Sequence, residues 1–218
     1  MRRDNELQQL ILSELKWEPS INAAQIGVGV KDGVVTLSGA VDTFAQKFAA
    51  ERAAERIAGV RAIADELAVV TMGDYKKTDA DIARAAANAI LWDVEVPTEK
   101  VKVIVQDGWV TLEGNVDWYF QKASAERALR YLAGVKGVTN RIKIQPPKAK
   151  VADIKSEIES AFRRHAELDA RKIQVETVEG KVTLNGTVRS WAEREDAERA
   201  AWCAPGVSQV NDHLSVSM

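Results

Sequence analysis

The sequence contains one cysteine, Cys203, and no marked excess of charge of either sign. A single cysteine cannot form a disulfide within the chain, so nothing in the sequence demands an oxidising compartment. With 30 basic and 32 acidic side chains, the net charge is -2. There is no basic excess to bind a phosphate backbone by releasing its counterions, and we therefore expect no nucleic-acid partner.

Long apolar stretches are also lacking. No run of about 18 apolar residues occurs, so no transmembrane segment is expected. The sequence starts with mostly polar residues and continues with a helical pattern. It lacks the apolar core and small-residue cleavage site of a secretory signal peptide. As given, the sequence indicates a cytoplasmic protein, or a periplasmic one if a signal peptide has been removed.

Catalytic and metal-binding patterns are absent too. The two histidines, His165 and His213, fall in different predicted elements, whereas a zinc site needs three or four clustered ligands. Cys203 has no base nearby in the sequence pattern that would make it a nucleophile. We find no phosphate-binding loop, dinucleotide fingerprint or nucleophile elbow. We therefore expect no enzyme: no catalytic residues, no cofactor and no metal.

What the sequence does have is a threefold repeat. The string Asp-Gly-Trp-Val-Thr-Leu-Glu-Gly-Asn-Val at 107–116 recurs in related form at 32–41, 75 residues earlier, and at 179–188, 72 residues later. A period of this length indicates tandem copies of one module. Modules this small are only marginally stable alone, so we expect intramolecular packing between them. The predicted module boundaries are 4–70, 79–144 and 151–217.

Each copy predicts the element order α-β-β-α-β. In the first copy, apolar residues at helical spacing between 5 and 17 predict a helix, and alternating apolar residues at 26–30 predict a strand. Asp32 and Gly33 suit a tight hairpin turn, because glycine accepts a positive φ. A second strand, a helix capped by a polar residue, and a third strand complete the copy.

Comparison of the three copies shows which residues the fold requires. Most of the positions that are identical in all three are glycines or small apolar residues, which we interpret as determinants of the fold. The identical Glu-Arg pair follows a basic residue by four positions and is interpreted as a surface pairing on a helix. In the first copy the identical positions are Gly33, Val35, Thr36, Leu37, Gly39, Val41, Ala50, Glu51, Arg52, Ala53, Gly59 and Val60.

Aromatic residues, in contrast, differ among the copies and supply the candidate binding surface. Aromatic and basic side chains together at the start of a helix suit a lipid headgroup region or a protein interface. Packing between modules or between copies of the chain is the competing interpretation, in which Tyr119 belongs to the core and Trp118 fills a seam between modules. The candidate surface consists of Trp109, Trp118, Tyr119, Phe120, Lys122, Arg127 and Arg130.

These repeats resemble the BON domain, a module of bacterial osmotic-shock and nodulation-associated proteins. The residues that match this family best are Gly108, Val110, Thr111, Leu112, Gly114, Val116, Gly134 and Val135. The segments Trp92-Asp93 through Pro97 and Trp118-Tyr119 also resemble its members with three modules. The resemblance implies an α+β fold in which each module is a small three-stranded mixed sheet with two helices on one face. It also implies a non-enzymatic role in binding phospholipid surfaces or other ligands.

Two hypotheses about function follow. The first is a non-enzymatic binding or interaction protein linked to osmotic or envelope stress, with an anionic phospholipid surface, implied by the family, or a protein as its partner. The second is a soluble cytoplasmic stress protein or sensor that binds an ion or small ligand between modules. Exposure or burial of Trp109 and Trp118 is the structural observation that bears on both.

Overall fold

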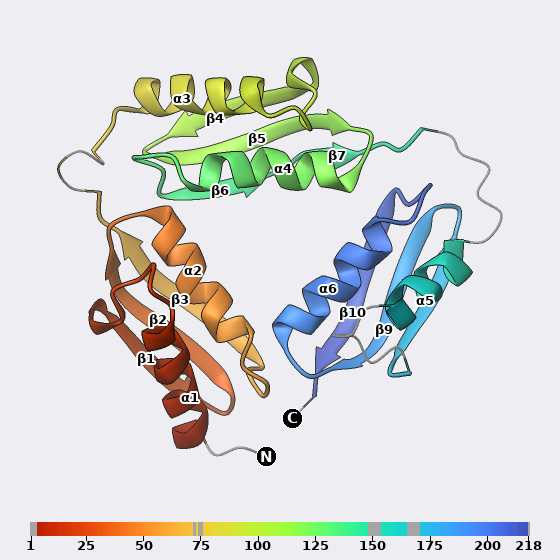
Figure 1. Ribbon diagram of the computed structural model, residues 1–218, viewed down its shortest axis with the longest axis horizontal. Coiled ribbons are helices and arrows are strands. Elements are labelled where there is room, and N and C mark those ends of the chain that lie inside the picture. Colours follow the sequence, from red (N-terminus) through yellow and green to blue (C-terminus); the bar gives the residue numbers. More distant parts are fainter. Residues whose placement is uncertain (1–3, 72, 74–75, 148–153, 165–170, 218) are drawn as a thin grey trace. The chain divides into compact units, whose positions relative to one another are not determined.

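The computed structural model describes residues 4–71, 73, 76–147, 154–164 and 171–217. In this part of the chain, the element order helix–strand–strand–helix–strand occurs three times (Figure 1). Each set of strands forms a small mixed sheet, so the structure confirms the predicted α+β fold of three tandem modules.

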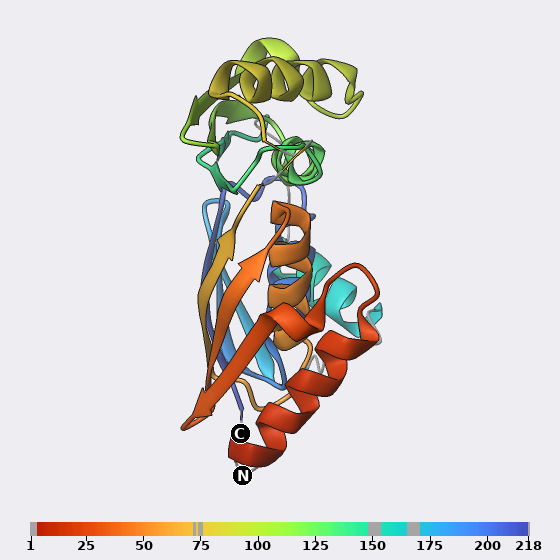
Figure 2. The ribbon, with the colours of Figure 1, turned by 90° about the vertical axis from the view of Figure 1, so that its left-hand side faces the viewer.

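The first module has its two helices on the same side of its sheet (Figure 2). Leu7, Ile11 and Leu15 are buried, as the helical spacing predicts, and Ala50 and Ala53 are fully buried where the second helix lies on the sheet. Strands β1 and β2 are antiparallel, and the strand order is β1-β2-β3. The elements are α1 (Asp4–Trp17), η1 (Ala23–Gln25), β1 (Ile26–Lys31), β2 (Val34–Val41), α2 (Phe44–Glu55) and β3 (Ala62–Val69).

The second module repeats this plan with a divided last strand. Asn140 ends β6: its side-chain Oδ1 accepts the backbone N–H of Ile142 at 3.2 Å, and its Nδ2 donates to the backbone carbonyl of Lys122 at 2.9 Å. The continuous strand that the sequence predicts is therefore split in two, β6 and β7, both parallel to β5. The elements are α3 (Asp79–Trp92), η3 (Thr98–Lys100), β4 (Val101–Gln106), β5 (Trp109–Val116), α4 (Tyr119–Arg130), β6 (Gly137–Asn140) and β7 (Lys143–Ile144).

The third module has an unbroken last strand that is parallel to its neighbour. Ser190 caps its second helix, where the sequence predicts the helix to begin, by accepting the backbone N–H of Glu193 at 3.2 Å. Arg194, in the first half of that helix, lies 2.5 Å from Asp212 on the last strand, so it ties the helix to the sheet. The elements are α5 (Ile154–Arg164), β8 (Ile173–Val178), β9 (Lys181–Val188), α6 (Trp191–Trp202) and β10 (Gln209–Val216).

The second glycine of the repeated string, Gly114, lets β5 approach the backbone just before β4 closely. At Gly114, φ is +143°, and a Cβ atom there would lie 1.9 Å from the carbonyl oxygen of Lys100. No side chain fits in that space, which explains why all three copies have glycine at this position. The predicted role of the repeated glycines as scaffold has its physical basis here.

Candidate functional site

Three aromatic residues begin α4 at one end of the second module. The side-chain Oε1 of Gln121 accepts the backbone N–H groups of Asp117 and Trp118, both at 3.0 Å, and so holds the first turn of the helix. Trp118 and Tyr119 are half-buried, whereas the ring of Phe120 is 50% exposed. Of the three, Phe120 therefore presents the most open surface to a partner.

The predicted basic residues lie along the same helix, but they are not unpaired charges. Arg127 Nη2 lies 3.0 Å from Glu95 Oε2 in the loop after α3. Arg130 Nη2 lies 3.7 Å from Glu126 Oε1, one turn earlier. Lys122 is half-buried. These side chains mainly hold α4 in place, and the positive charge that they offer to an anionic partner is reduced by neighbouring carboxylates.

Trp109 lies apart from this group. It is the first residue of β5, and Trp118 comes just after the other end of that eight-residue strand. At about 3.3 Å per residue, the strand is roughly 23 Å long, so the two tryptophans lie beyond reach of each other at its opposite ends. The structure therefore does not bring all seven predicted residues together: six are spread along α4, from Trp118 before its first residue to Arg130 at its last, and Trp109 lies apart from them.

Three neighbouring apolar side chains near the end of α3 are more exposed than any of the predicted ones. The exposed fractions are 63% for Leu91, 83% for Trp92 and 100% for Val94, compared with 50% for Phe120, the most exposed of the predicted aromatic residues. Exposed apolar side chains that cluster in this way commonly mark an interaction site. The sequence analysis did not select these residues as a binding surface.

One pattern in the sequence would have pointed to them. Trp17 occupies the position of Trp92 in the first copy, and its side chain is 84% exposed. In both modules this tryptophan ends the first helix and lies off the buried stripe, which is formed in α3 by Ile82, Ala86 and Ile90. A tryptophan that repeats at a position outside the core stripe is not explained by core packing.

The end of α3 and the start of α4 lie at the same end of the second module (Figure 1). The loop after α3 leads into Val101, which pairs with Gly114 near the end of β5, and β5 leads directly into α4. Lys100 Nζ lies 3.1 Å from both carboxylate oxygens of Asp117, which joins the two segments. We refer to Leu91, Trp92, Val94, Trp118 and Phe120 together as the loop end.

The loop itself is tied to α4. The hydroxyl group of Ser124 donates a hydrogen bond to Glu95 Oε2, and Arg127 lies against the same oxygen. The hydrogen bond from Ser124 is the main cause that lowers the pKa of Glu95, with the positive charge of Arg127 adding to it. Glu95 therefore stays ionised at neutral pH and holds the loop with its exposed Val94 in a defined position.

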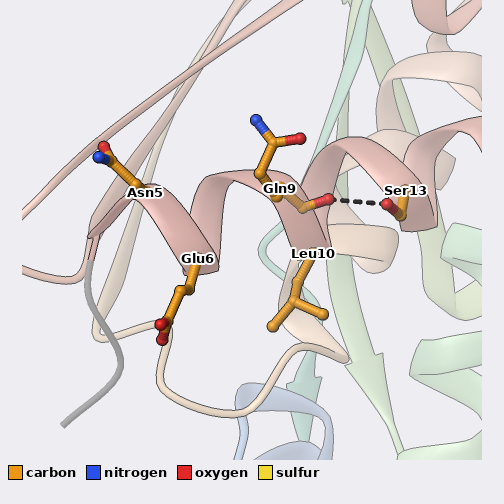
Figure 3. Close-up of a pocket in the computed structure, with 5 residues that line it drawn as sticks. All are labelled: Asn5, Glu6, Gln9, Leu10 and Ser13. Atoms are coloured by element: carbon orange, nitrogen blue, oxygen red, sulfur yellow. Dashed lines mark hydrogen bonds between the residues drawn. The ribbon is translucent and has the colours of Figure 1, made fainter.

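The described surface has a hollow beside the loop end and another on the first module. One of about 460 Å³ adjoins the loop end and has both acidic and basic lining. The other, of about 490 Å³, lies along the exposed side of α1, where Ser13 donates to the carbonyl oxygen of Gln9 at 2.8 Å (Figure 3). Its lining residues all come from α1, so no groups from different elements converge there. The first hollow is lined by Glu99, Lys100, Lys102, Glu113, Gly114, Asn115, Asp117 and Gln145.

Catalytic and metal chemistry gain no support from the side chains that the structure places. Among the described residues, no three His, Cys, Asp or Glu side chains are grouped so that they could hold a metal ion. Cys203 is exposed just after the end of α6, and His213 is exposed on β10, while His165 lies outside the described residues. Within the described ranges, no helix has the length and hydropathy needed to cross a bilayer.

Comparison with known proteins identifies relatives of this chain. Osmotically-inducible protein Y of Escherichia coli (strain K12) is 33% identical over 144 residues, which cover 64% of this chain and 72% of that protein. Two solved chains of CdsD, a structural protein of the Type III secretion system of Chlamydia trachomatis, are 12% and 11% identical. They cover 96% and 100% of this chain, and 91% and 100% of their own length, with TM-scores of 0.26 and 0.27. With TM-scores this low, we infer nothing about the fold or function of this chain from CdsD.

The family comparison agrees with the repeat that the sequence displays. The model of the BON domain matches the chain three times, at residues 3–71, 78–146 and 150–218. Each match includes one helix–strand–strand–helix–strand set. The chain therefore belongs to the BON domain family and contains three BON domains in tandem.

Proposed function

We propose that this chain is a non-enzymatic binding protein of the osmotic-stress response that docks on phospholipid surfaces through its loop end. Similarity to Osmotically-inducible protein Y supports the link to osmotic stress. The observation that carries the docking role is the joint exposure of Leu91 and Trp92 at the end of α3 and of Val94 in the loop that Glu95 holds in place.

The chemistry of these three side chains suits the boundary between water and hydrocarbon. Tryptophan is enriched there because its ring is apolar and its N–H is polar. Complete burial of a leucine or valine side chain contributes about 1.5–3 kcal/mol. Leu91 and Val94 beside Trp92 therefore supply a driving force of several kcal/mol on the same scale, and the tethered loop loses little conformational freedom on docking.

Charge plays a smaller part in this proposal than apolar insertion. Acidic and basic side chains occur in equal numbers between residues 79 and 144. Lys100 and Arg127 lie near the loop end, but each is paired with a carboxylate, Asp117 or Glu95. We therefore expect binding to anionic vesicles to depend only weakly on salt, unlike the binding of a basic amphipathic helix.

Co-sedimentation with vesicles of phosphatidylethanolamine and phosphatidylglycerol tests the proposal. The expected result is that wild-type protein pellets with the vesicles and that Trp92→Ala weakens binding at least fivefold. Tyr131→Ala is the matched control, because Tyr131 is also exposed but follows the opposite end of α4. Absence of wild-type binding at low salt, or equal binding by Trp92→Ala, would contradict the proposal.

The polar hollow beside the loop end favours a second candidate function, the binding of a small ion or solute. Lys100 and Asp117 are paired at its rim, and Lys102 and Gln145 add further polar groups. A ligand that binds only the native state raises the melting temperature by mass action. A thermal-shift series over salts, divalent cations and osmolytes measures this, and unchanged melting temperatures throughout would count against this candidate.

A further inference from the structure

The sheet of the second module has an outer face, opposite α3 and α4, that the docking role does not use. Side chains alternate along a strand, and Val110 and Leu112 of β5 are fully buried in the core. Trp109 and Thr111 therefore lie on the outer face. Their neighbours there, given by the strand register, are Gln106 and Gly137 beside Trp109, Ile104 and Thr139 beside Thr111, and Lys102 beside Glu113.

The indole ring of Trp109 is fixed on this face. Its Nε1 donates a hydrogen bond to Thr139 Oγ1 at 2.7 Å. The six-membered part of the ring lies over Gly137, because a Cβ atom there would come within 2.5 Å of the ring carbon Cζ3. One side of the ring thus rests on the backbone of β6, and Trp109 keeps 48% of its surface exposed. The ring is held in place before any ligand arrives.

This pairing of tryptophan with glycine is particular to the second module. In the first module the same two positions are Val34 and Ala62, and in the third they are Lys181 and Gln209. The fold therefore forms without the pair. A fixed aromatic ring with a glycine beneath it is better explained by a ligand than by the requirements of the scaffold.

The charged side chains that the strand register places on the outer face, Lys102 and Glu113, lie away from Trp109. Arg141 Nη1 lies 3.8 Å from Glu113 Oε1, and Lys102 is opposite Glu113 in the strand register. Nearer to Trp109 the face has neutral polar groups, the amide of Gln106 and the hydroxyl of Thr111. A nucleic acid could stack a base on the ring, but its phosphates need basic side chains, and the strand register gives Trp109 only Gln106 and Gly137 as neighbours. The part of the face around Trp109 is therefore suited to an uncharged ligand.

Sugars have the chemistry that matches such a face. The flat side of an aromatic ring is electron-rich, and the C–H groups of a sugar ring are polarised by the neighbouring oxygens, so they are attracted to it. The sugar hydroxyls both donate and accept hydrogen bonds, as do the side chains of Gln106 and Thr111. Trp109 lies flat against the sheet, unlike the projecting Trp92, and so is suited to stacking rather than to insertion into a bilayer.

We propose that the outer face of the second module binds a neutral carbohydrate chain, with one sugar ring stacked on Trp109 and hydroxyl groups bonded to Gln106 and Thr111. This site is separate from the loop end, and its ligand differs from the lipid of the proposed function. The position of the ring depends on Gly137, so Trp109 and Gly137 act as one unit.

Titration of the full chain, followed by proton–nitrogen NMR, tests this inference. The probes are maltotriose, cellotriose and chitotriose, and the Trp109 indole resonance is assigned by its loss in Trp109→Phe. The expected result is that at least one probe shifts the Trp109 indole and the Thr111 and Thr139 amides in a saturable way. No saturable shift with any of the three probes would overturn the proposal.

A double variant tests the site without endangering the fold. Trp109→Val combined with Gly137→Ala copies the pair that the first module has at Val34 and Ala62. We expect it to bind the active probe at least tenfold more weakly, while Trp92→Ala binds as wild type. Binding by the double variant within twofold of wild type would overturn the role of Trp109.

Discussion

The carboxylate of Asp79 holds the hairpin turn at Gly108. Its Oδ1 accepts the backbone N–H of Gly108 at 2.8 Å, and its Oδ2 accepts that of Asp107 at 2.8 Å. In the first module, Asp4 makes the same pair of bonds to its own turn. The first residue of α1 and the first residue of α3 thus each fix the hairpin turn that comes 28 residues later in the chain. In both modules this contact links the first helix to the sheet.

Asp79→Ala is expected to destabilise the second module by about 1–2 kcal/mol, because two hydrogen bonds to a charged group are lost at a site where water can replace them only in part. The opening free energy of the second module, measured by amide hydrogen exchange, checks this value. Asp107→Asn is the control and should be close to neutral, since asparagine tolerates the positive φ of 52° found there. Equal exchange in Asp79→Ala and wild type would contradict the assignment.

The hairpin turn of the third module is strained at Glu179. This residue has a φ of +49°, a conformation that glutamate adopts less readily than asparagine or glycine. Glu179→Asn is expected to stabilise the third module by about 0.5–1 kcal/mol. Glu176→Asn, on the exposed side of β8, is the matched control without such a gain. Hydrogen exchange in β8 and β9 measures both, and a destabilised Glu179→Asn would show that backbone strain at this turn does not limit the stability of the module.

Close backbone approach makes Gly114 the position in the second module most sensitive to a small change. A Cβ atom there would lie 1.9 Å from the Lys100 carbonyl oxygen, and backbone cannot move aside as a flexible side chain can. Gly114→Ala is expected to cost about 4 kcal/mol or more, the upper range for single substitutions. Gly29→Ala, whose new Cβ would have its nearest neighbour at 3.9 Å, is the control. Circular dichroism melting compares the two variants, and similar melting temperatures would contradict the clash.

The hydrogen bond between Ser124 and Glu95 predicts a dependence on pH. Because this bond lowers the pKa of Glu95 in the folded protein, the stability that Glu95 contributes is present above its unfolded pKa and is lost as the pH falls through its folded pKa. In Ser124→Ala the pKa of Glu95 should rise toward its ordinary value. Carbon-13 NMR titration of the Glu95 carboxyl group measures this shift, and an unchanged pKa would show that Arg127 alone sets the charge state.

The pattern of the sequence predicts the modules, their element order and most of their core, because these features depend on local periodicity and on glycines that repeat. Leu7, Ile11 and Leu15 are buried as expected, and α6 begins directly after Ser190, near the predicted start. The break at Asn140 could not be predicted in the same way, since it depends on a side chain that bonds both to the nearby N–H of Ile142 and to the carbonyl of Lys122 on α4. Packing between the modules stays a prediction.

The candidate surface was harder to predict for a related reason. The sequence marks Trp109 and Trp118 as unusual, but the length of β5 places them at opposite ends of the module. Arg127 looks like a free cation in sequence, and only the fold brings Glu95 to it. Trp92 recurs as Trp17, yet exposure is a property of the folded chain. Comparison of the three copies identifies the residues that the fold requires. It is less effective at identifying a binding surface, because exposure and pairing depend on the folded structure.

The central claim, that the exposed loop end docks on lipid, is tested most directly by fluorine NMR of the full chain labelled with 5-fluorotryptophan. Each of the 6 tryptophans gives its own resonance, and Trp92→Phe and Trp109→Phe assign the two that matter. On addition of phosphatidylethanolamine–phosphatidylglycerol vesicles, the account predicts a shifted or broadened Trp92 resonance and little change at Trp109 beyond that of overall binding. The docking claim would be contradicted if the protein did not bind the vesicles at all. It would also be contradicted if the protein bound them while the Trp92 resonance kept the position and width that it has in water.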